Sequence, residues 1–116
     1  MSGSNQECVF CRIASGQVKA DRVLETEDVV AFRDLNPQAP THILVIPRVH
    51  VASLNELEDP DLAGRVLMAA RQVAGEEGLA EAGYRVVVNQ GSDGGQTVFH
   101  LHVHVLGGRR MTWPPG

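Results

Sequence analysis

The chain has 116 residues, 43% hydrophobic and 21% charged, and a formal net charge of −4. This length suits one domain with one core, and the interspersed acidic and basic residues are unlike the basic face of a nucleic-acid-binding protein. No apolar run approaches membrane-spanning length, and residues 1–7 lack the basic and apolar regions of a secretory signal. We therefore expect a cytoplasmic protein with a single domain over residues 1–116 and a flexible N-terminus at residues 1–7.

The spacing of apolar and turn-forming residues predicts two helices and about five strands. Asp59–Pro60 is typical of a helix start, with Asp as N-cap and Pro at the first helical position. In chain order we expect a helix over Cys8–Ala14, strands over Arg22–Thr26, Val29–Arg33 and His42–Ile46, a long helix over Asp59–Gly78, a strand over Tyr84–Asn89, and a last strand from about Val98 to Leu106. This pattern predicts an α+β fold with a mostly antiparallel sheet, followed by a C-terminal tail over residues 109–116.

The last predicted strand carries three of the chain's five histidines, His100, His102 and His104. Because side chains alternate along a strand, we expect the imidazoles on one face and the intervening aliphatic residues on the other. Three interpretations remain open: a hydrogen-bonded or solvated face, a metal site, and phosphoryl or nucleotidyl transfer by an imidazole nitrogen. The glycine-rich loop Gly91–Gly95 favours the third as an anion-binding nest, although it also suits a plain hairpin connection.

The run His100–Leu106 resembles the signature of the histidine-triad (HIT) family, in which three histidines alternate with hydrophobic residues. The blocks Asp34–His42 and Leu106–Gly116 are similar to the Hint branch of that family, and the resemblance extends from about Cys8 to the last residue. It implies a HIT fold and a homodimeric hydrolase that cleaves the P–N bond of purine nucleoside 5′-phosphoramidates. The alternatives are a hydrolase of dinucleoside polyphosphates, a non-catalytic nucleotide-binding interaction protein, and a catalytic metal on the three-histidine face.

The resemblance also implies roles for individual residues. His102 would be the nucleophile and carry a nucleotidyl intermediate, His104 and His42 would contact the phosphate, and His100 would help to orient the strand. Thr97 takes the place of a hydroxyl residue, often Ser, near the leaving amine. The residues implied to bind the nucleotide are Asp34 at the ribose, Asn89, Gly95, Gln96 and Val98 at the phosphate, Val9, Phe10, Ile13, Phe32 and Leu35 at the purine, and Trp113, whose tail would reach across a dimer interface.

Several of these residues also fit purely structural roles. The five apolar residues are of types that commonly fill a core, and Asp34 could simply cap the Asn36–Pro37 turn.

The two cysteines, Cys8 and Cys11, are separated by two residues and are a poor framework for disulfides. A thioredoxin-like redox pair requires a βαβ context that the predicted hairpin does not supply. In several HIT relatives such a pair joins two histidines, which would here be His50 and His100. The resemblance therefore implies a structural zinc on Cys8, Cys11, His50 and His100, with two free thiols as the alternative, and no metal in the chemistry itself.

Overall fold

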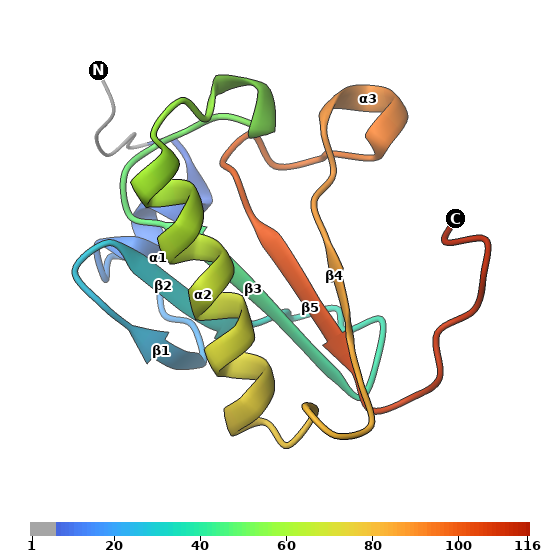
Figure 1. The fold of residues 1–116 in the computed structure, drawn as a ribbon. Helices are drawn as coiled ribbons and strands as arrows, with labels where there is room; N and C mark the ends of the chain where they lie inside the picture. The colour runs from blue at the N-terminus through green and yellow to red at the C-terminus, as the bar shows by residue number, and fades with distance from the viewer. Residues whose placement is uncertain (1–6) are drawn as a thin grey trace.

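The computed structural model describes residues 7–116 and has a five-stranded sheet as its central layer (Figure 1). The strand order is β1-β2-β3-β5-β4, and every neighbouring pair is antiparallel. The elements are α1 (Val9–Ala14), β1 (Arg22–Glu25), β2 (Val29–Arg33), β3 (Thr41–Pro47), η1 (Leu54–Glu56), α2 (Pro60–Glu76), β4 (Arg85–Val87), α3 (Gly91–Gly94) and β5 (Val103–Gly107). The predicted α+β architecture, with one long helix and a short N-terminal helix, is confirmed.

Strand β3 shows how the sheet acquires two apolar faces. Ile43 and Val45 belong to the core beneath α2, whereas Leu44 and Ile46 belong to a second cluster that includes the apolar side of α1. Successive side chains of a strand point to opposite faces, so a strand covered on both faces must be apolar throughout. The two helices therefore lie on opposite faces, as Figure 1 shows, and the histidines share the α1 face.

The last strand is shorter than predicted, since β5 begins at Val103 rather than near Val98. Pro47 ends the partner strand β3 and has no N–H to donate to a continuing ladder. The carbonyl of Pro47 bonds instead to Nε2 of His100 at 2.8 Å, and the Leu101 N–H donates to the carbonyl of Val51 at 2.6 Å. His100 and His102 consequently precede the strand.

Two further boundaries differ from expectation. The predicted loop Gly91–Gly95 contains a helical turn, α3, which ends at Gly95 with a positive φ of 84°. The buried side chain of Gln96 stabilises this turn by accepting the Gly91 N–H at 3.0 Å. Strand β4 is limited to Arg85–Val87, two residues shorter at its C-terminal side and one residue shorter at its N-terminal side than the predicted strand.

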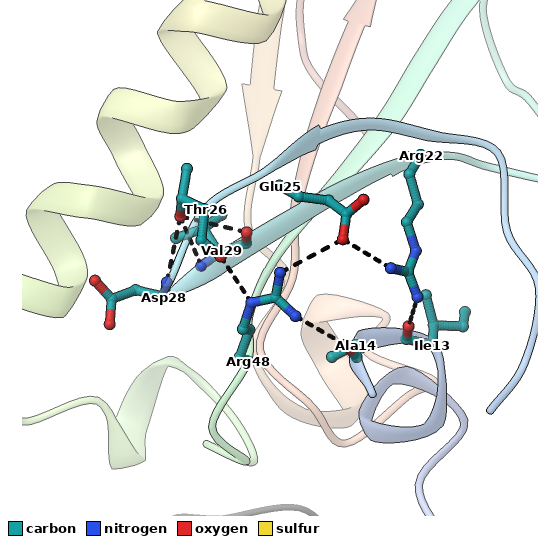
Figure 2. Close-up of polar contacts among 8 residues, drawn as sticks. All are labelled: Ile13, Ala14, Arg22, Glu25, Thr26, Asp28, Val29 and Arg48. Carbon is teal, nitrogen blue, oxygen red and sulfur yellow. Dashed lines mark hydrogen bonds and ion pairs between the residues drawn. The ribbon is translucent and has the colours of Figure 1, made fainter. Parts of the chain in front are cut away.

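Two arginines hold α1 against the β1–β2 hairpin (Figure 2). Arg48 donates to the Ala14 carbonyl at 2.9 Å and to the turn between β1 and β2 at 2.7 Å. Arg22 donates to the Ile13 carbonyl and pairs with Glu25 at 2.8 Å. The last carbonyls of a helix have no partner within the helix, so these contacts satisfy the end of α1 and fix its position.

The C-terminal tail leaves the end of β5 and extends away from the sheet (Figure 1). Arg85 donates to the Thr112 carbonyl at 2.8 Å, and the side chain of Trp113 is exposed. Within residues 7–116, no helix has the length and apolar character needed to cross a membrane. The predicted flexible N-terminus lies outside the described residues, apart from Glu7.

Candidate active site

His102 and His104 line a cleft of about 360 Å³ between α1 and the sheet, which we call the histidine cleft. Its floor follows from strand register, because Phe32 pairs with Leu44 and Leu44 pairs with His104. These three residues therefore share one face of the sheet. A larger open groove of about 630 Å³ lies against α2 and contains neither histidine nor cysteine. Of these two hollows, the smaller cleft is therefore the one that offers imidazole nitrogens to a ligand.

Within residues 7–116, one ring nitrogen of His102 has a hydrogen-bond partner and the other has none. Its Nδ1 lies 2.7 Å from the carbonyl oxygen of His100. Because a carbonyl oxygen only accepts, Nδ1 carries the proton in the neutral ring and Nε2 carries the lone pair. The ring of Phe10 packs edge-to-face against the same imidazole, with ring centroids 5.2 Å apart. An imidazole oriented in this way can act as a nitrogen nucleophile.

A chain of hydrogen bonds determines the tautomers of His42 and His104. The backbone N–H of Gln38 donates to Nδ1 of His42 at 3.0 Å, so the proton of His42 is on Nε2. That nitrogen lies 2.9 Å from Nδ1 of His104, which must accept. His104 therefore carries its own proton on Nε2, a buried atom without a hydrogen-bond partner among residues 7–116. An unpaired buried donor in this cleft suits an anionic oxygen of a ligand.

The pKa values of these histidines favour the same neutral forms. Burial, followed by repulsion from His102 and His42, lowers the pKa of His104 to about 4. Burial also lowers the pKa of His42, although the nearby Asp34 carboxylate raises it and offsets part of the effect. Both rings are consequently hydrogen-bonding groups rather than cations at neutral pH.

Most of the residues implied to bind the nucleotide line the histidine cleft. The Asp34 carboxylate makes two contacts with residues that the structure describes: one oxygen accepts the Asn36 N–H at 2.8 Å, and the other lies 3.5 Å from Nε2 of His42. The turn-capping interpretation and a place in the cleft are therefore compatible. The implied residues that line the cleft are Val9, Phe10, Ile13, Phe32, Asp34, Leu35, Thr97, Val98, His102 and His104.

Other implied residues lie elsewhere, namely Asn89, Gly95, Gln96 and Trp113, while His42 lies behind His104. The N–H groups of Gly95 and Gln96 donate within the α3 turn, at 3.1 and 2.9 Å. The Gln96 side chain donates to the carbonyls of Ala52 and Val98, at 2.9 and 3.1 Å. The N–H groups of Gly95 and Gln96 thus have acceptors within the turn, and their contact with a phosphate stays a prediction.

Five lining residues did not emerge from the sequence: Val18, Lys19, Ala20, Arg33 and Leu44. Leu44 could have been found from strand register, since it lies opposite Phe32. Residues 18–20 connect α1 to β1 and carry no motif, so only the three-dimensional fold brings them to the cleft.

A second cluster of side chains lies next to the histidine cleft, since the Phe10 ring contacts both His100 of the cluster and His102 of the cleft. The ligand atoms of Cys8, Cys11, His50 and His100 all lie within 4.8 Å of one another. Nδ1 of His100 is 3.3 Å from the Cys8 sulfur and 3.4 Å from the Cys11 sulfur, and Nδ1 of His50 is 3.3 Å from the Cys11 sulfur.

These residues fit a tetrahedral zinc ion. Ordinary zinc–sulfur and zinc–nitrogen bonds would put sulfur and nitrogen about 3.5 Å apart. Nε2 of His100 bonds to a carbonyl, which leaves the lone pair on the Nδ1 that faces the thiols. Burial lowers the pKa of His100 to about 4, and the neutral ring is the form that binds metal.

The fold and the cleft thus define a class of small α+β proteins that present a line of histidines to a ligand cleft. Residues 15–111 match the HIT domain family, and the chain belongs to this family. The predicted HIT fold and the resemblance to the Hint branch are confirmed.

Similar proteins share most of the chain. It is 46% identical to the adenylylsulfatase HINT1 of Arabidopsis thaliana over 97% of this chain and 79% of that protein. It is 50% identical to a 14 kDa zinc-binding protein of Zea mays over 93% and 87% of the two chains. A crystal structure of a HIT family hydrolase from Legionella pneumophila Philadelphia 1 is 51% identical, has a TM-score of 0.93, and covers 95% of this chain and 100% of that one.

Proposed function

We propose that this chain hydrolyses purine nucleoside 5′-phosphoramidates through a nucleotidyl intermediate on His102. The observation that carries the proposal is the 2.7 Å contact between Nδ1 of His102 and the His100 carbonyl, which leaves Nε2 as a free nucleophile. Covalent catalysis of this kind divides one difficult displacement into two easier ones.

The two steps balance as follows. The Nε2 lone pair of His102 forms a bond to the α-phosphorus while the P–N bond to the amine breaks, and the leaving nitrogen gains a proton from solvent. Water then forms a P–O bond while the bond from phosphorus to Nε2 breaks, which releases the nucleoside monophosphate and loses a proton to solvent. The unpaired Nε2–H of His104 would donate to the phosphoryl oxygens in both steps.

The other walls of the histidine cleft suit the rest of a nucleotide. Asp34 lies at the end of β2 beside the histidines, where its carboxylate would accept from ribose hydroxyls. The apolar side chains of Val9, Ile13 and Phe32 would enclose the purine. Thr97 would contact the leaving amine.

The decisive experiment is turnover of adenosine 5′-phosphoramidate by wild type and His102→Ala, each with and without EDTA. We expect wild-type activity to survive chelation and to fall by about 10³-fold or more in the variant. Rapid quenching and mass spectrometry should find the nucleotidyl adduct on wild type only. A folded wild type without turnover would contradict the proposal and favour dinucleoside polyphosphates, then simple nucleotide binding.

A second candidate substrate is adenosine 5′-phosphosulfate, because the 46% identical Arabidopsis relative is an adenylylsulfatase. The attack by His102 would be the same, with sulfate rather than an amine as leaving group. Comparing kcat/KM for the two substrates on one enzyme preparation distinguishes the candidates.

We also propose that Cys8, Cys11, His50 and His100 hold a structural zinc ion. When bound, it would join α1 to the segment that carries the nucleophile. Metal analysis of protein purified without chelator should give about one zinc per chain, and Cys11→Ser should lose the metal and lower the melting temperature. Far less than one zinc per wild-type chain would contradict this proposal.

We further propose that the chain forms a homodimer. Strand β4 lies at the edge of the sheet, and Val86 and Val88 on or next to it are exposed. Leu67 and Met68 of α2, 60% and 57% exposed, extend the apolar surface. Unpaired strand edges with apolar neighbours favour association, and a two-fold dimer is the commonest symmetric assembly. In such a dimer each Trp113 tail would approach the partner's nucleotide site.

A further inference from the structure

Lys19 is the only lysine of the chain, beside nine arginines, and it lines the histidine cleft. A lysine ammonium donates up to three hydrogen bonds and accepts none. A single group of this kind in a mostly apolar cleft selects for acceptor atoms on a ligand.

The strand order puts Lys19 and the nucleophile at opposite ends of the cleft. Lys19 lies on the segment before β1, whereas His104 is on β5 and His102 directly precedes it. Since β2 and β3 lie between β1 and β5, the two ends are roughly 14 Å apart at ordinary strand spacing. With the phosphate at His102 and the ribose at Asp34, the base extends toward Lys19.

Lys19 is also free to bind a ligand. Among residues 7–116 it has no hydrogen bond or ion pair, whereas neighbouring cations are engaged. Arg33 forms two bonds of 2.9 Å with Glu77, and Arg22 pairs with Glu25 at 2.8 Å. Lys19 is thus the unengaged cation of the cleft.

We propose that Lys19 contacts the edge of the base and makes the cleft prefer 6-oxopurines over adenine, an inference that rests on the proposed nucleotide site. Guanine and hypoxanthine present two adjacent acceptors, O6 and N7, to an ammonium. Adenine replaces O6 with an amino donor, which an ammonium cannot pair with.

The test is calorimetric titration of the full chain with GMP, IMP and AMP, which share one phosphate and undergo no P–N cleavage. We expect GMP and IMP to bind about five- to tenfold more tightly than AMP, because the contact is charged but partly exposed to solvent. Lys19→Met, which keeps an apolar stem, should bring the three affinities within twofold. Lys19→Arg should retain the preference, since Arg also pairs with O6 and N7.

Two controls make the result specific. Arg12→Met removes the same charge from the exposed side of α1, outside the cleft lining, and should leave the GMP-to-AMP ratio unchanged. With labelled lysine the chain gives one side-chain NMR signal, which should shift more with GMP and IMP than with AMP. A ratio below two in wild type, or the same ratio in Lys19→Met, would overturn the Lys19 proposal alone. Failure of all three nucleotides to bind would overturn the proposed function with it.

Discussion

At the scale of single residues, the three triad histidines differ in what their nitrogens contact. His100 directs Nδ1 toward the thiols and Nε2 toward the Pro47 carbonyl, so both nitrogens serve the structure. His102 has one nitrogen bound to the backbone, and His104 has one bound to His42. The two nitrogens left over, both Nε2, are the nucleophile and the donor of the proposed reaction.

The lowered pKa of His104 predicts acid sensitivity. The native ring resists protonation until about pH 4, whereas the unfolded chain takes up this proton near pH 6.5. The unfolded state therefore binds more protons between these values, and stability falls as the pH decreases through this window. Between pH 7 and pH 4, wild type should lose about 1–2 kcal/mol more free energy of unfolding than His104→Gln, because solvent around the partly exposed ring reduces the effect.

Urea denaturation of both proteins at the two pH values, in EDTA, measures this difference. The glutamine retains an acceptor for His42, so the comparison isolates the titrating ring. Equal losses in the two proteins would contradict the prediction, because they would show that unfolding adds no proton to His104 in this pH window.

At the scale of elements, α1 links the two sites. It contributes Phe10 and Ile13 to the histidine cleft and carries Cys11 of the cysteine–histidine cluster. A six-residue helix is too short to be stable by itself. Its position depends on packing against the sheet and on the arginine contacts in Figure 2.

Removing Arg48 should therefore loosen α1. Arg48→Met deletes the bonds to Ala14 and to the turn between β1 and β2, and should lower the free energy of unfolding by about 1–2 kcal/mol. The substitution should accelerate amide hydrogen exchange in α1 and leave exchange in α2 unchanged. It should also weaken nucleotide binding. Arg71→Met, an exposed arginine of α2, is the matched control and should change neither measurement.

Local signals predicted the elements better than their ends. The Asp59 cap and the proline after it located the start of α2 because both act within one helical turn. The start of β5 could not be predicted in this way, since it depends on Pro47 in another strand. The His42–His104 contact joins residues 62 positions apart and was not predicted, since the family resemblance implied only that both residues lie near the phosphate.

At the scale of the whole molecule, the exposed edge strand and α2 define the proposed dimer face. Val86→Asp places a charge on that edge and should shift the protein from dimer to monomer in sedimentation or light-scattering measurements, with circular dichroism unchanged. Phe99→Asp changes an exposed apolar residue, 60% accessible, outside β4 and α2, and should leave the mass unchanged. A wild type that is monomeric at all concentrations would contradict the dimer.

The strand order has a consequence for synthesis of the chain. β5 is synthesised after the other four strands of the described sheet, yet it lies between β3 and β4 and is the strand with which β4 pairs. A nascent chain that ends before residue 103 therefore lacks β5 and His104. Its sheet is incomplete, because β3 and β4 are both without the strand that pairs with them. Completion of the sheet and assembly of the cleft therefore require synthesis through β5, so products truncated before residue 103 should be unfolded and susceptible to proteolysis rather than partly active.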